Sequence, residues 1–391
     1  MNRQVYLKPS WKMHAFGNQM MAYPPDGYEF VTPKTPETRV LNAASRWEIG
    51  YSLLWLADRA LPTGLIKAWA ERMDKASDGT LLTYTWDLLI SRPEPWVIEV
   101  EYASHVLGGH LKHLRRFKGT LERALASPFC RKIRCWAETG RRSLLADLDV
   151  HGFADKIEVV YYAVPPRSFV KEYTCENVKL LFIGSGTSKR GFDYRGGREV
   201  LEAFALLRQR HDNLELVVRS DVPPDVRARY SGLPGLTIID EFISRDTLDK
   251  EFKSADIFLL PSHNTPVMNI LDAMSYELPV ITLDAWANPE YVEDGKTGLV
   301  AVRSKKLQYY YQDTAQPNFA SRAFAEGIQR PDPVVVQDII AKIDLLIQDP
   351  NLRRQMGKAG RWEVERGKFS LAKMNKKLAR LFDSALDGDR R

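Results

Sequence analysis

From about Val178 onward, short apolar runs alternate with segments in which apolar residues recur every three or four positions. The short runs are typical of buried parallel strands, and the spacing between them is typical of amphipathic helices. The predicted strands are Lys179–Ile183, Leu214–Arg219, Leu236–Ile239, Ile257–Leu260, Val280–Thr282 and Gly298–Val302. The predicted helices are Glu199–Arg210, Thr247–Ser254 and Met268–Tyr276. This alternation predicts a doubly wound parallel sheet, which binds ligands at the carboxyl ends of its strands.

The first 165 residues show the same alternation less regularly. The predicted strands there are Trp96–Val100, Ile133–Trp136 and Ile157–Tyr162, and the predicted helices are Trp47–Leu56, Thr63–Lys75 and Arg141–Leu148. Pro165 and Pro166 follow, and two prolines cannot join a helix or a central strand, so they stiffen a short connection. We therefore predict a second α/β domain over residues 1–165, with its boundary at these prolines.

Three further helices are predicted beyond Asp332, over Pro333–Gln348, Asn351–Glu365 and Leu371–Ser384. The expected domains are an amino-terminal domain of residues 1–165, a second domain of residues 166–350, and carboxyl-terminal helices in residues 351–391. The predicted fold class is therefore α/β, with two Rossmann-like domains, each built on a doubly wound parallel sheet.

The amino-acid composition of the chain limits the classes of protein to which it can belong. The chain has 391 residues, of which 44% are hydrophobic and 27% charged, and its net charge is +6. No apolar run approaches the roughly 18 residues that span a bilayer, so a transmembrane enzyme is excluded, and a wholly disordered chain is excluded too. Met1–Ser10 lacks the apolar stretch of a secretory signal, so we expect a cytoplasmic protein. The cysteines, Cys130, Cys135 and Cys175, form no CxxC pair, which argues against disulfides and structural zinc.

The most informative segment runs from Pro261 to Thr282, from a strand end through a loop into a helix and back to a strand. Unpaired amides at the start of that helix, together with the helix dipole, make an anion site suited to a diphosphate. Asp272 lies in the first turns of the helix, where a carboxylate can accept hydrogen bonds from the vicinal hydroxyls of a ribose. Asn264 precedes it by eight residues and offers an amide to a second polyol.

In this segment the sequence resembles the family-4 (group 1) glycosyltransferases, which are retaining enzymes of the GT-B fold. Their pattern has a proline-serine pair, a glutamate, seven residues, a glutamate-alanine-methionine run, and then a proline-valine-isoleucine strand followed by another glutamate. The corresponding residues here are Pro261-Ser262, Asn264, Asp272-Ala273-Met274, Pro279-Val280-Ile281 and Glu290. The resemblance implies that Asn264 and Asp272 stand where the family has its two glutamates. It implies a donor-binding role for Glu290 as well, although Glu290 could equally cap a short helix at Asn288–Val292.

A second match to this family lies upstream, in a glycine-rich turn followed by basic residues and a helix that reads Leu201-Glu202-Ala203-Phe204. Arg195 falls on the family's lysine position, which implies that it neutralises the leaving diphosphate. Ser185 replaces a family arginine, and Lys189 or Arg190 is expected to substitute for it. The resemblance assigns donor binding to one set of residues: Gly184, Ser185, Gly186, Lys189, Arg190, Thr265, Val267, Met268, Asp272 and Glu290.

Catalytic roles are expected for Arg195, Asn264 and Glu101. The family has a histidine near the end of a strand that corresponds to the one carrying Glu101, so Glu101 is expected to take its place. His105 follows Glu101 by four residues. The expected function is retaining transfer of a sugar from a nucleotide-sugar to a glycan, lipid-linked or small-molecule acceptor across a cleft between the domains. The resemblance also implies that the last helix, Leu371–Ser384, crosses back onto the first domain. No metal and no cofactor beyond the nucleotide-sugar are expected. The alternative is a degenerate homologue that binds a nucleotide, a glycan or a protein partner without catalysis, because Asn264 and Asp272 depart from the family pattern.

Other patterns carry less weight. The glycines at 184 and 186 lack the spacing of a dinucleotide fingerprint, and there is no GxxxxGK[ST] motif. Asp147-Leu-Asp149 matches a short metal-binding DxD pattern but is interpreted as a helix end. Ten basic residues lie between His105 and Arg142, and Leu111, Leu114 and Phe117 give part of this stretch an amphipathic pattern. It predicts a solvated face, a binding surface for a phosphorylated acceptor, or peripheral attachment to the inner, anionic membrane face. No nucleic-acid-binding motif accompanies the charge.

Overall fold

The computed structural model of the chain describes residues 2–8, 15–32, 60–70, 79–173, 177–184, 189–241 and 243–387. The chain divides into two compact units. The first unit comprises Met1–Tyr162, Tyr310–Ala320 and Ala372–Arg391, and the second comprises Ala163–Tyr309 and Ser321–Leu371. The first break, at Ala163, lies two residues before Pro165. The predicted boundaries did not separate Tyr310–Ala320 from the second domain.

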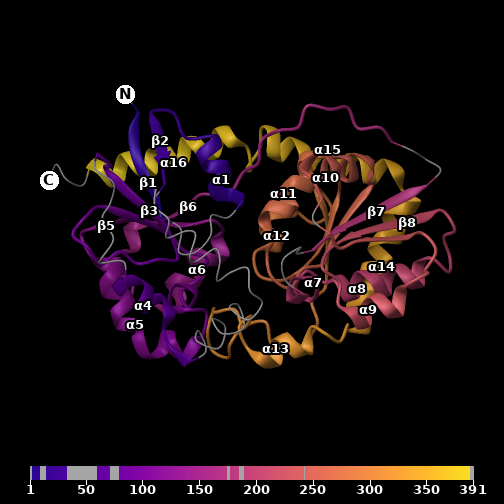
Figure 1. Cartoon of the computed structure of the whole chain (residues 1–391), viewed down its shortest axis with the longest axis horizontal. Coiled ribbons are helices and arrows are strands. Elements are labelled where there is room, and N and C mark those ends of the chain that lie inside the picture. Colours follow the sequence, from indigo (N-terminus) through magenta and orange to yellow (C-terminus); the bar gives the residue numbers. More distant parts are fainter. Residues whose placement is uncertain are drawn as a thin grey trace. The chain divides into compact units, whose positions relative to one another are not determined.

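The first unit holds a six-stranded sheet in the order β2-β1-β3-β4-β5-β6, in which every neighbouring pair is parallel (Figure 1). Its strands are β1 (Arg3–Lys8), β2 (Tyr28–Val31), β3 (Leu82–Trp86), β4 (Trp96–Glu99), β5 (Cys130–Cys135) and β6 (Ile157–Val159). Its helices are α1 (Ala15–Ala22), α4 (Thr63–Ala70), α5 (Leu111–Ala126), α6 (Glu138–Asp147) and α16 (Leu371–Asp387), with short 3-10 turns η2 (His105–Leu107) and η3 (Ala154–Lys156). The predicted helix at Trp47–Leu56 and Cys175 lie outside the described residues.

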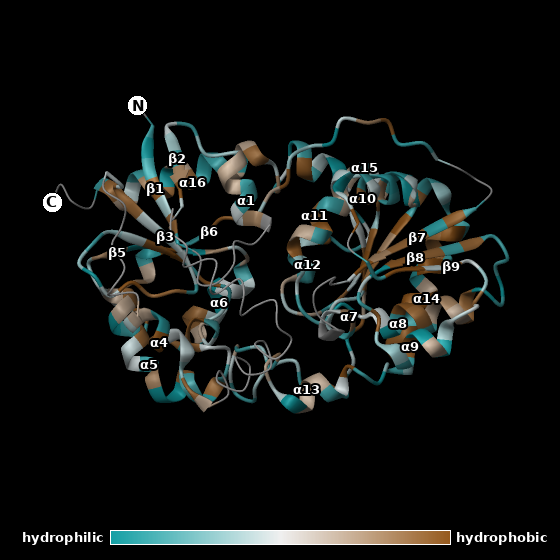
Figure 2. Cartoon of the chain, viewed as in Figure 1, coloured by the Kyte–Doolittle hydropathy of each residue, from teal (hydrophilic) through white to brown (hydrophobic). Residues whose placement is uncertain are grey.

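The second unit holds another six-stranded parallel sheet, in the order β12-β11-β10-β7-β8-β9. Its strands are β7 (Val178–Ile183), β8 (Leu214–Arg219), β9 (Leu236–Ile239), β10 (Ile257–Leu260), β11 (Val280–Leu283) and β12 (Gly298–Ala301). Its helices are α7 (Lys189–Tyr194), α8 (Gly197–Leu207), α9 (Pro224–Tyr230), α10 (Arg245–Ser254), α11 (Val267–Ser275), α12 (Asn288–Tyr291), α13 (Arg322–Gly327), α14 (Pro333–Gln348) and α15 (Pro350–Glu365). In Figure 2, β7 and β8 are mostly hydrophobic, whereas many residues of the helices around them are hydrophilic.

Helix α16 packs on the sheet of the first unit. The carboxylate of Asp383 accepts hydrogen bonds of 2.7 Å from Nη1 of Arg3 on β1 and from the hydroxyl of Tyr28 on β2. The buried ring of Phe382 packs edge-on against Tyr84 of β3. The last helix therefore completes the core of the amino-terminal half of the chain.

Helix α5 does not present the apolar face that the sequence pattern suggested for membrane attachment. Its apolar residues Leu111 and Leu114 are buried in the core of the first unit, and Phe117 packs against that core, so this face is not available to insert into a membrane. The basic stretch is also divided, because Arg134 is fully buried and Lys132 pairs with Glu158 at 2.6 Å. The exposed cations of α5 are Lys112, Arg115, Arg116, Lys118 and Arg123. Among the described residues, no helix is both long and apolar enough to cross a bilayer.

Candidate active site

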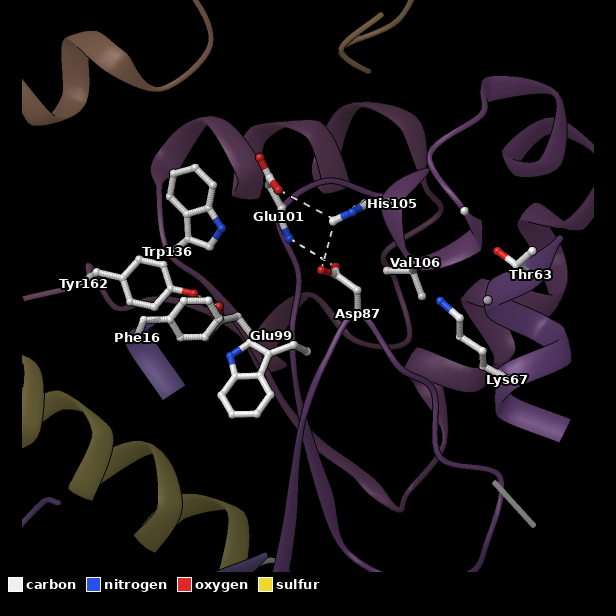
Figure 3. A pocket seen from close by; sticks show the side chains of 13 residues that line it. Phe16, Thr63, Lys67, Asp87, Glu99, Glu101, His105, Val106, Trp136 and Tyr162 are labelled. Carbon is white, nitrogen blue, oxygen red and sulfur yellow. Dashed lines mark hydrogen bonds and ion pairs between the residues drawn. The ribbon is translucent and has the colours of Figure 1, made fainter. Parts of the chain in front are cut away.

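A pocket of about 340 Å³ opens at the carboxyl ends of β3 and β4 in the first unit (Figure 3). It combines charged side chains with aromatic walls, and its lining includes Lys67, Asp87, Glu101 and His105. Helix α4 brings Lys67 to the pocket by packing closely on η2. That packing requires Gly64, because a Cβ there would lie 1.8 Å from the carbonyl oxygen of Val106.

Two carboxylates flank His105 at the base of this pocket. Nδ1 of His105 lies 3.0 Å from Oδ2 of Asp87 and 3.6 Å from Oε2 of Glu101, and Figure 3 shows both acids directed toward the imidazole. Asp87 follows β3 with a φ of +48°, in the left-handed region that aspartate tolerates better than most residues. Burial opposes the positive charge, but Asp87 and Glu101 outweigh it and raise the pKa of His105 to about 9. The imidazole is therefore a cation at neutral pH, held between two anions.

The wall of the pocket next to Asp87, Glu101 and His105 contains a buried ion pair. Glu99, at the end of β4, lies 2.9 Å from Nη1 of Arg134 on β5, and neither side chain is more than 4% exposed. The hydroxyls of Tyr84 and Tyr162 also bond the Glu99 carboxyl group. Burial raises the pKa of Glu99 to about 7, although Arg134 and Tyr84 favour the ionised carboxylate. Nε of Arg134 donates to the carbonyl oxygen of Val160 at 3.1 Å, which ties this pair to the residue directly after β6.

Aromatic rings form the other side of the pocket. The ring of Phe16 lies 4.7 Å from that of Tyr162 and 5.3 Å from that of Trp86, measured between centroids. The ring of Trp136 stacks on Tyr162 at 6.1 Å. A concave site with apolar rings on one side and a few directed polar groups on the other suits a ligand with both a CH-rich face and hydroxyl groups.

The second unit brings two of the predicted catalytic residues together. Nη1 of Arg195 donates a hydrogen bond of 2.7 Å to Oδ1 of Asn264. Arg195 lies between α7 and α8, directly before Gly196, whose φ is +80°. A Cβ at Gly196 would lie 2.2 Å from the carbonyl oxygen of Pro261, so glycine is needed for the two connections to approach each other.

Asn264 precedes the amino terminus of α11, where the first amides of the helix have no intrahelical acceptor. Oδ1 of Asn264 also contacts the hydroxyl of Ser262 at 2.9 Å, and no described residue accepts a hydrogen bond from its Nδ2. Thr265 is held by the amide of Ala287, whose N–H donates to its hydroxyl at 3.0 Å. Val267 and Met268 open the helix. Among the described residues, the contacts of Asn264 thus engage its oxygen and leave Nδ2 as a hydrogen-bond donor without an acceptor.

A buried histidine supports this loop. His263, directly before Asn264, is 1% exposed; its Nε2 lies 3.2 Å from Oε1 of Glu199 and its Nδ1 lies 2.8 Å from the hydroxyl of Tyr309. Both ring nitrogens are therefore engaged, which fixes the orientation of the backbone that carries Asn264.

Asp272 projects from α11 between two arginines. Its Oδ1 lies 3.0 Å from Nη2 of Arg167 and 3.3 Å from Nη2 of Arg245. Arg167 comes from the chain that follows the first unit, and Arg245 opens α10. Two cations thus hold the carboxylate through Oδ1, and no described residue donates a hydrogen bond to Oδ2.

The remaining predicted donor residues have mixed outcomes. Gly184 ends β7 against Ser220, whose Oγ would lie 2.3 Å from an added Cβ. Ser185 and Gly186 lie outside the described residues. Lys189 and Arg190 are the first two residues of α7. Glu290 is part of α12, and its backbone oxygen accepts a hydrogen bond from Nζ of Lys368 at 2.8 Å.

Several residues of these sites escaped sequence reasoning. Asp87 follows a strand that was not predicted, and Lys67 lies on a predicted helix with no motif around it. Arg167 and Arg245 reach Asp272 from 105 and 27 residues away. The one signal that could have indicated Asp87 is the run Leu82–Trp86, which alternates threonine with large residues before an acid.

The second unit matches known proteins in sequence. A family model described as "Glycosyl transferases group 1" matches residues 177–310. Sulfoquinovosyl transferase SQD2 from Arabidopsis thaliana is 22% identical over 222 residues, which are 54% of this chain and 37% of that protein. The chain thus spans little more than a third of the length of this curated relative.

Solved structures resemble the whole chain. Sucrose-phosphate synthase from Thermosynechococcus elongatus superposes with a TM-score of 0.62 at 12% identity, covering 98% of each chain. HepE from Anabaena, solved with UDP-glucose, superposes with a TM-score of 0.61 at 12% identity, covering 98% of this chain and 100% of HepE. Identity this low shows a common fold only. The prediction of two Rossmann-like domains is confirmed.

Proposed function

We propose that this chain, which carries a group 1 glycosyltransferase domain and has the GT-B fold, transfers a sugar from a nucleotide-sugar to an acceptor hydroxyl with retention of anomeric configuration. The observation that carries the proposal is the Arg195–Asn264 hydrogen bond beside the amino terminus of α11. A cation, a helix terminus and an amide donor at one sheet edge suit a diphosphate attached to a sugar.

The donor roles follow from the contacts. Arg195 and the first amides of α11 would bind the diphosphate, Nδ2 of Asn264 would donate to a sugar hydroxyl, and the free oxygen of Asp272 would accept from the ribose. Gly184, Thr265 and Glu290 would complete the donor site at neighbouring strand ends. This assignment is supported by the family match, which includes all of these residues.

The acceptor would occupy the pocket of the first unit. Asp87 and Glu101 can accept hydrogen bonds from hydroxyl groups, and the rings of Phe16 and Trp86 can cover a CH-rich face. These features favour a sugar, or another polyol group, as the part of the acceptor that binds. Glu101 would orient the reacting hydroxyl, with His105 holding that carboxylate in place.

In the proposed reaction the bond between the anomeric carbon and the phosphate oxygen breaks as the acceptor oxygen bonds the same face of that carbon. The departing phosphate oxygen takes the acceptor proton, and the nucleoside diphosphate leaves. Negative charge grows on that phosphate, where Arg195 and the helix amides stabilise it. A double-displacement route would need a carboxylate nucleophile at the anomeric carbon; Asn264, at the sugar position, is an uncharged amide and supplies none.

The test is product formation from a panel of UDP-, GDP- and ADP-sugars, beginning with UDP-glucose because HepE was solved with it. We expect one donor to release nucleoside diphosphate and to give a glycoside of the same anomeric configuration, as read by NMR. EDTA should leave the rate unchanged, because cationic side chains do the work of a metal. Nucleotide binding without any product from the panel would instead favour a binding protein, which the uncharged Asn264 makes the second candidate.

An anionic membrane surface is a proposed partner on electrostatic grounds alone. Five cations of α5 are exposed, while the apolar face of that helix is buried. Binding of this kind should weaken steeply with salt. Cosedimentation with anionic liposomes at low salt, lost at high salt and absent with neutral liposomes, would support a cytoplasmic protein that attaches to the inner membrane face. No cosedimentation at low salt would contradict it.

A further inference from the structure

The segment Tyr310–Ala320 has no role in the proposed reaction, yet the chain leaves the second unit to place it in the first. It folds back on itself through a bridge between Tyr310 and Pro317. The segment docks at the end of α6, where Asp147 accepts hydrogen bonds from the backbone N–H of Ala315 at 3.1 Å. The Asp147-Leu-Asp149 pattern of the sequence thus binds chain atoms.

Gln316 is the centre of this docking. Its side chain is fully buried, and both ends of its amide are engaged. Oε1 accepts a hydrogen bond of 2.8 Å from the backbone N–H of Ser104. Nε2 donates to Oδ2 of Asp147 at 2.6 Å and approaches the carbonyl oxygen of Ser143 at 3.4 Å. A primary amide is needed for this pattern, because one end must accept and the other donate.

Ser104 lies within the loop that carries Glu101 and His105. The carbonyl oxygen of Ser104 accepts from the N–H of Gly109 at 2.8 Å, which closes the loop around η2. Tyr102 stacks on the His105 ring at 5.1 Å, and Phe319 packs edge-on against Tyr102 at 6.5 Å. Gln316 and Phe319 therefore hold the loop at two points, Ser104 and Tyr102, both of which lie between Glu101 and His105.

We infer that Gln316 is a positioning residue for the acceptor pocket: it fixes the loop from Glu101 to His105 and so sets where the carboxylate of Glu101 meets the acceptor hydroxyl. The inference rests on the proposed function for the pocket's role in binding the acceptor. The positioning itself rests on the contacts of Gln316 with Ser104 and Asp147.

The test compares Gln316→Leu, which keeps the volume and removes both hydrogen bonds, with the exchange Gln316→Glu plus Asp147→Asn. In the exchange a carboxylate at 316 accepts from Ser104 and from the new amide at 147, whose oxygen can still accept from Ala315. Gln316→Leu should raise the acceptor KM about tenfold or more while leaving the donor KM within about twofold, because only the acceptor hydroxyl is misplaced. The exchange should restore the acceptor KM to within about threefold.

A second readout needs no turnover. In protein labelled with ¹³C-histidine, the pKa of His105 should fall from about 9 to below about 8 in Gln316→Leu, since a displaced loop separates His105 from Asp87. If wild-type protein turns over no donor, the proposed function fails while this titration still tests the positioning. Gln337→Glu, an exposed change on α14, is the control and should alter neither readout.

Three results would overturn the inference: an unchanged acceptor KM and titration in Gln316→Leu, equal rises in donor and acceptor KM, or an exchange no better than Gln316→Glu alone. If Gln316→Leu does not fold, the comparison of Gln316→Glu with the exchange decides. The single change sets two carboxylates side by side, whereas the exchange keeps the native charge and can keep the hydrogen bonds that join Ser104, Ala315 and residues 147 and 316. It lacks only the contact with the carbonyl oxygen of Ser143.

Discussion

The guanidinium of Arg195 and the amide oxygen of Asn264 are joined by a hydrogen bond of 2.7 Å. The bond links the connection after β7 to the loop after β10, two adjacent strands of one parallel sheet. The oxygen of Asn264 is engaged by Arg195 and Ser262, and no described residue accepts a hydrogen bond from its NH₂ group. The pair thus presents a cation and a hydrogen-bond donor at the carboxyl edge of the sheet, and the donor chemistry proposed above depends on both.

Arg195→Ala should lower the turnover of the nucleotide-sugar by about a hundredfold to a thousandfold, because it removes charge stabilisation from the leaving diphosphate. The loss should appear in kcat more than in the acceptor KM. Arg210→Ala is the matched control: Arg210 follows α8 at the opposite edge of the sheet and pairs with Asp344 at 3.0 Å on the surface. Steady-state kinetics of both variants check the prediction, and a loss within a fewfold for Arg195→Ala would refute the assignment.

Asp272→Ala should abolish discrimination between a nucleoside diphosphate and its 2′-deoxy analogue. A carboxylate that accepts from a hydroxyl contributes about 1.5–3 kcal/mol, so the wild type should bind the ribonucleotide about tenfold to a hundredfold more tightly. Calorimetry with both nucleotides measures this ratio. Asp240→Ala, which removes an exposed partner of Arg227, should keep the ratio. Equal discrimination in wild type and Asp272→Ala would place the ribose elsewhere.

Asp87→Asn should lower the pKa of His105 from about 9 toward the ordinary 6.5, since only Glu101, at 3.6 Å, would then favour the cation. A raised pKa means that the ion pair stabilises the fold fully below about pH 6.5 and that this contribution disappears as the pH rises through about 9. The variant should therefore lose stability relative to wild type at pH 6 and approach it at pH 10. NMR titration and melting curves across this range check both statements; a titration unchanged by the substitution would show that Asp87 does not hold the charge.

Glu99→Gln should destabilise the first unit by about 3 kcal/mol or more, because it leaves the fully buried Arg134 cation without its anion. Glu158→Gln is the control on the neighbouring strand: its partner Lys132 lies 2.6 Å away, but Glu158 is 39% exposed, and the expected cost is below about 1 kcal/mol. Urea unfolding of the two variants compares them. Similar small losses would mean that water reaches the Arg134 site.

The strands of the second unit could be predicted because each is a short apolar run that is visible in the sequence. β8, β9 and β10 have the predicted bounds, since each is a β-branched or leucine-rich run followed by a helix. Only β10 is buried along its whole length, because β9 lies at the edge of the sheet. β3 was missed because Thr83 and Thr85 make it read as a half-exposed strand. Both threonines are buried, and Oγ1 of Thr85 donates to the carbonyl oxygen of Leu88 at 2.7 Å. The acceptor is a backbone carbonyl oxygen, which any residue supplies, so this hydrogen bond leaves no signal in the sequence.

The candidate site residues also divide into those that a local sequence motif indicates and those that it does not. Asn264 and Asp272 share one strand-loop-helix segment, so their spacing alone indicated their common edge of the sheet. Arg195 needed a second motif, and its bond to Asn264 confirms only that the two motifs meet. Asp87 and Gln316 belong to no motif, because tertiary packing alone brings them to the loop of Glu101 and His105. Long-range partners of this kind require the fold.

The most direct measurement of the central claim compares a nucleoside diphosphate with its monophosphate in wild type and in Arg195→Ala. Calorimetry would use whichever of UDP, GDP or ADP the wild type binds most tightly. If Arg195 binds the diphosphate, the wild type should bind the nucleoside diphosphate about tenfold or more tightly than the monophosphate. Arg195→Ala should bind the two nucleotides almost equally. A preference that survives unchanged in Arg195→Ala would contradict the account.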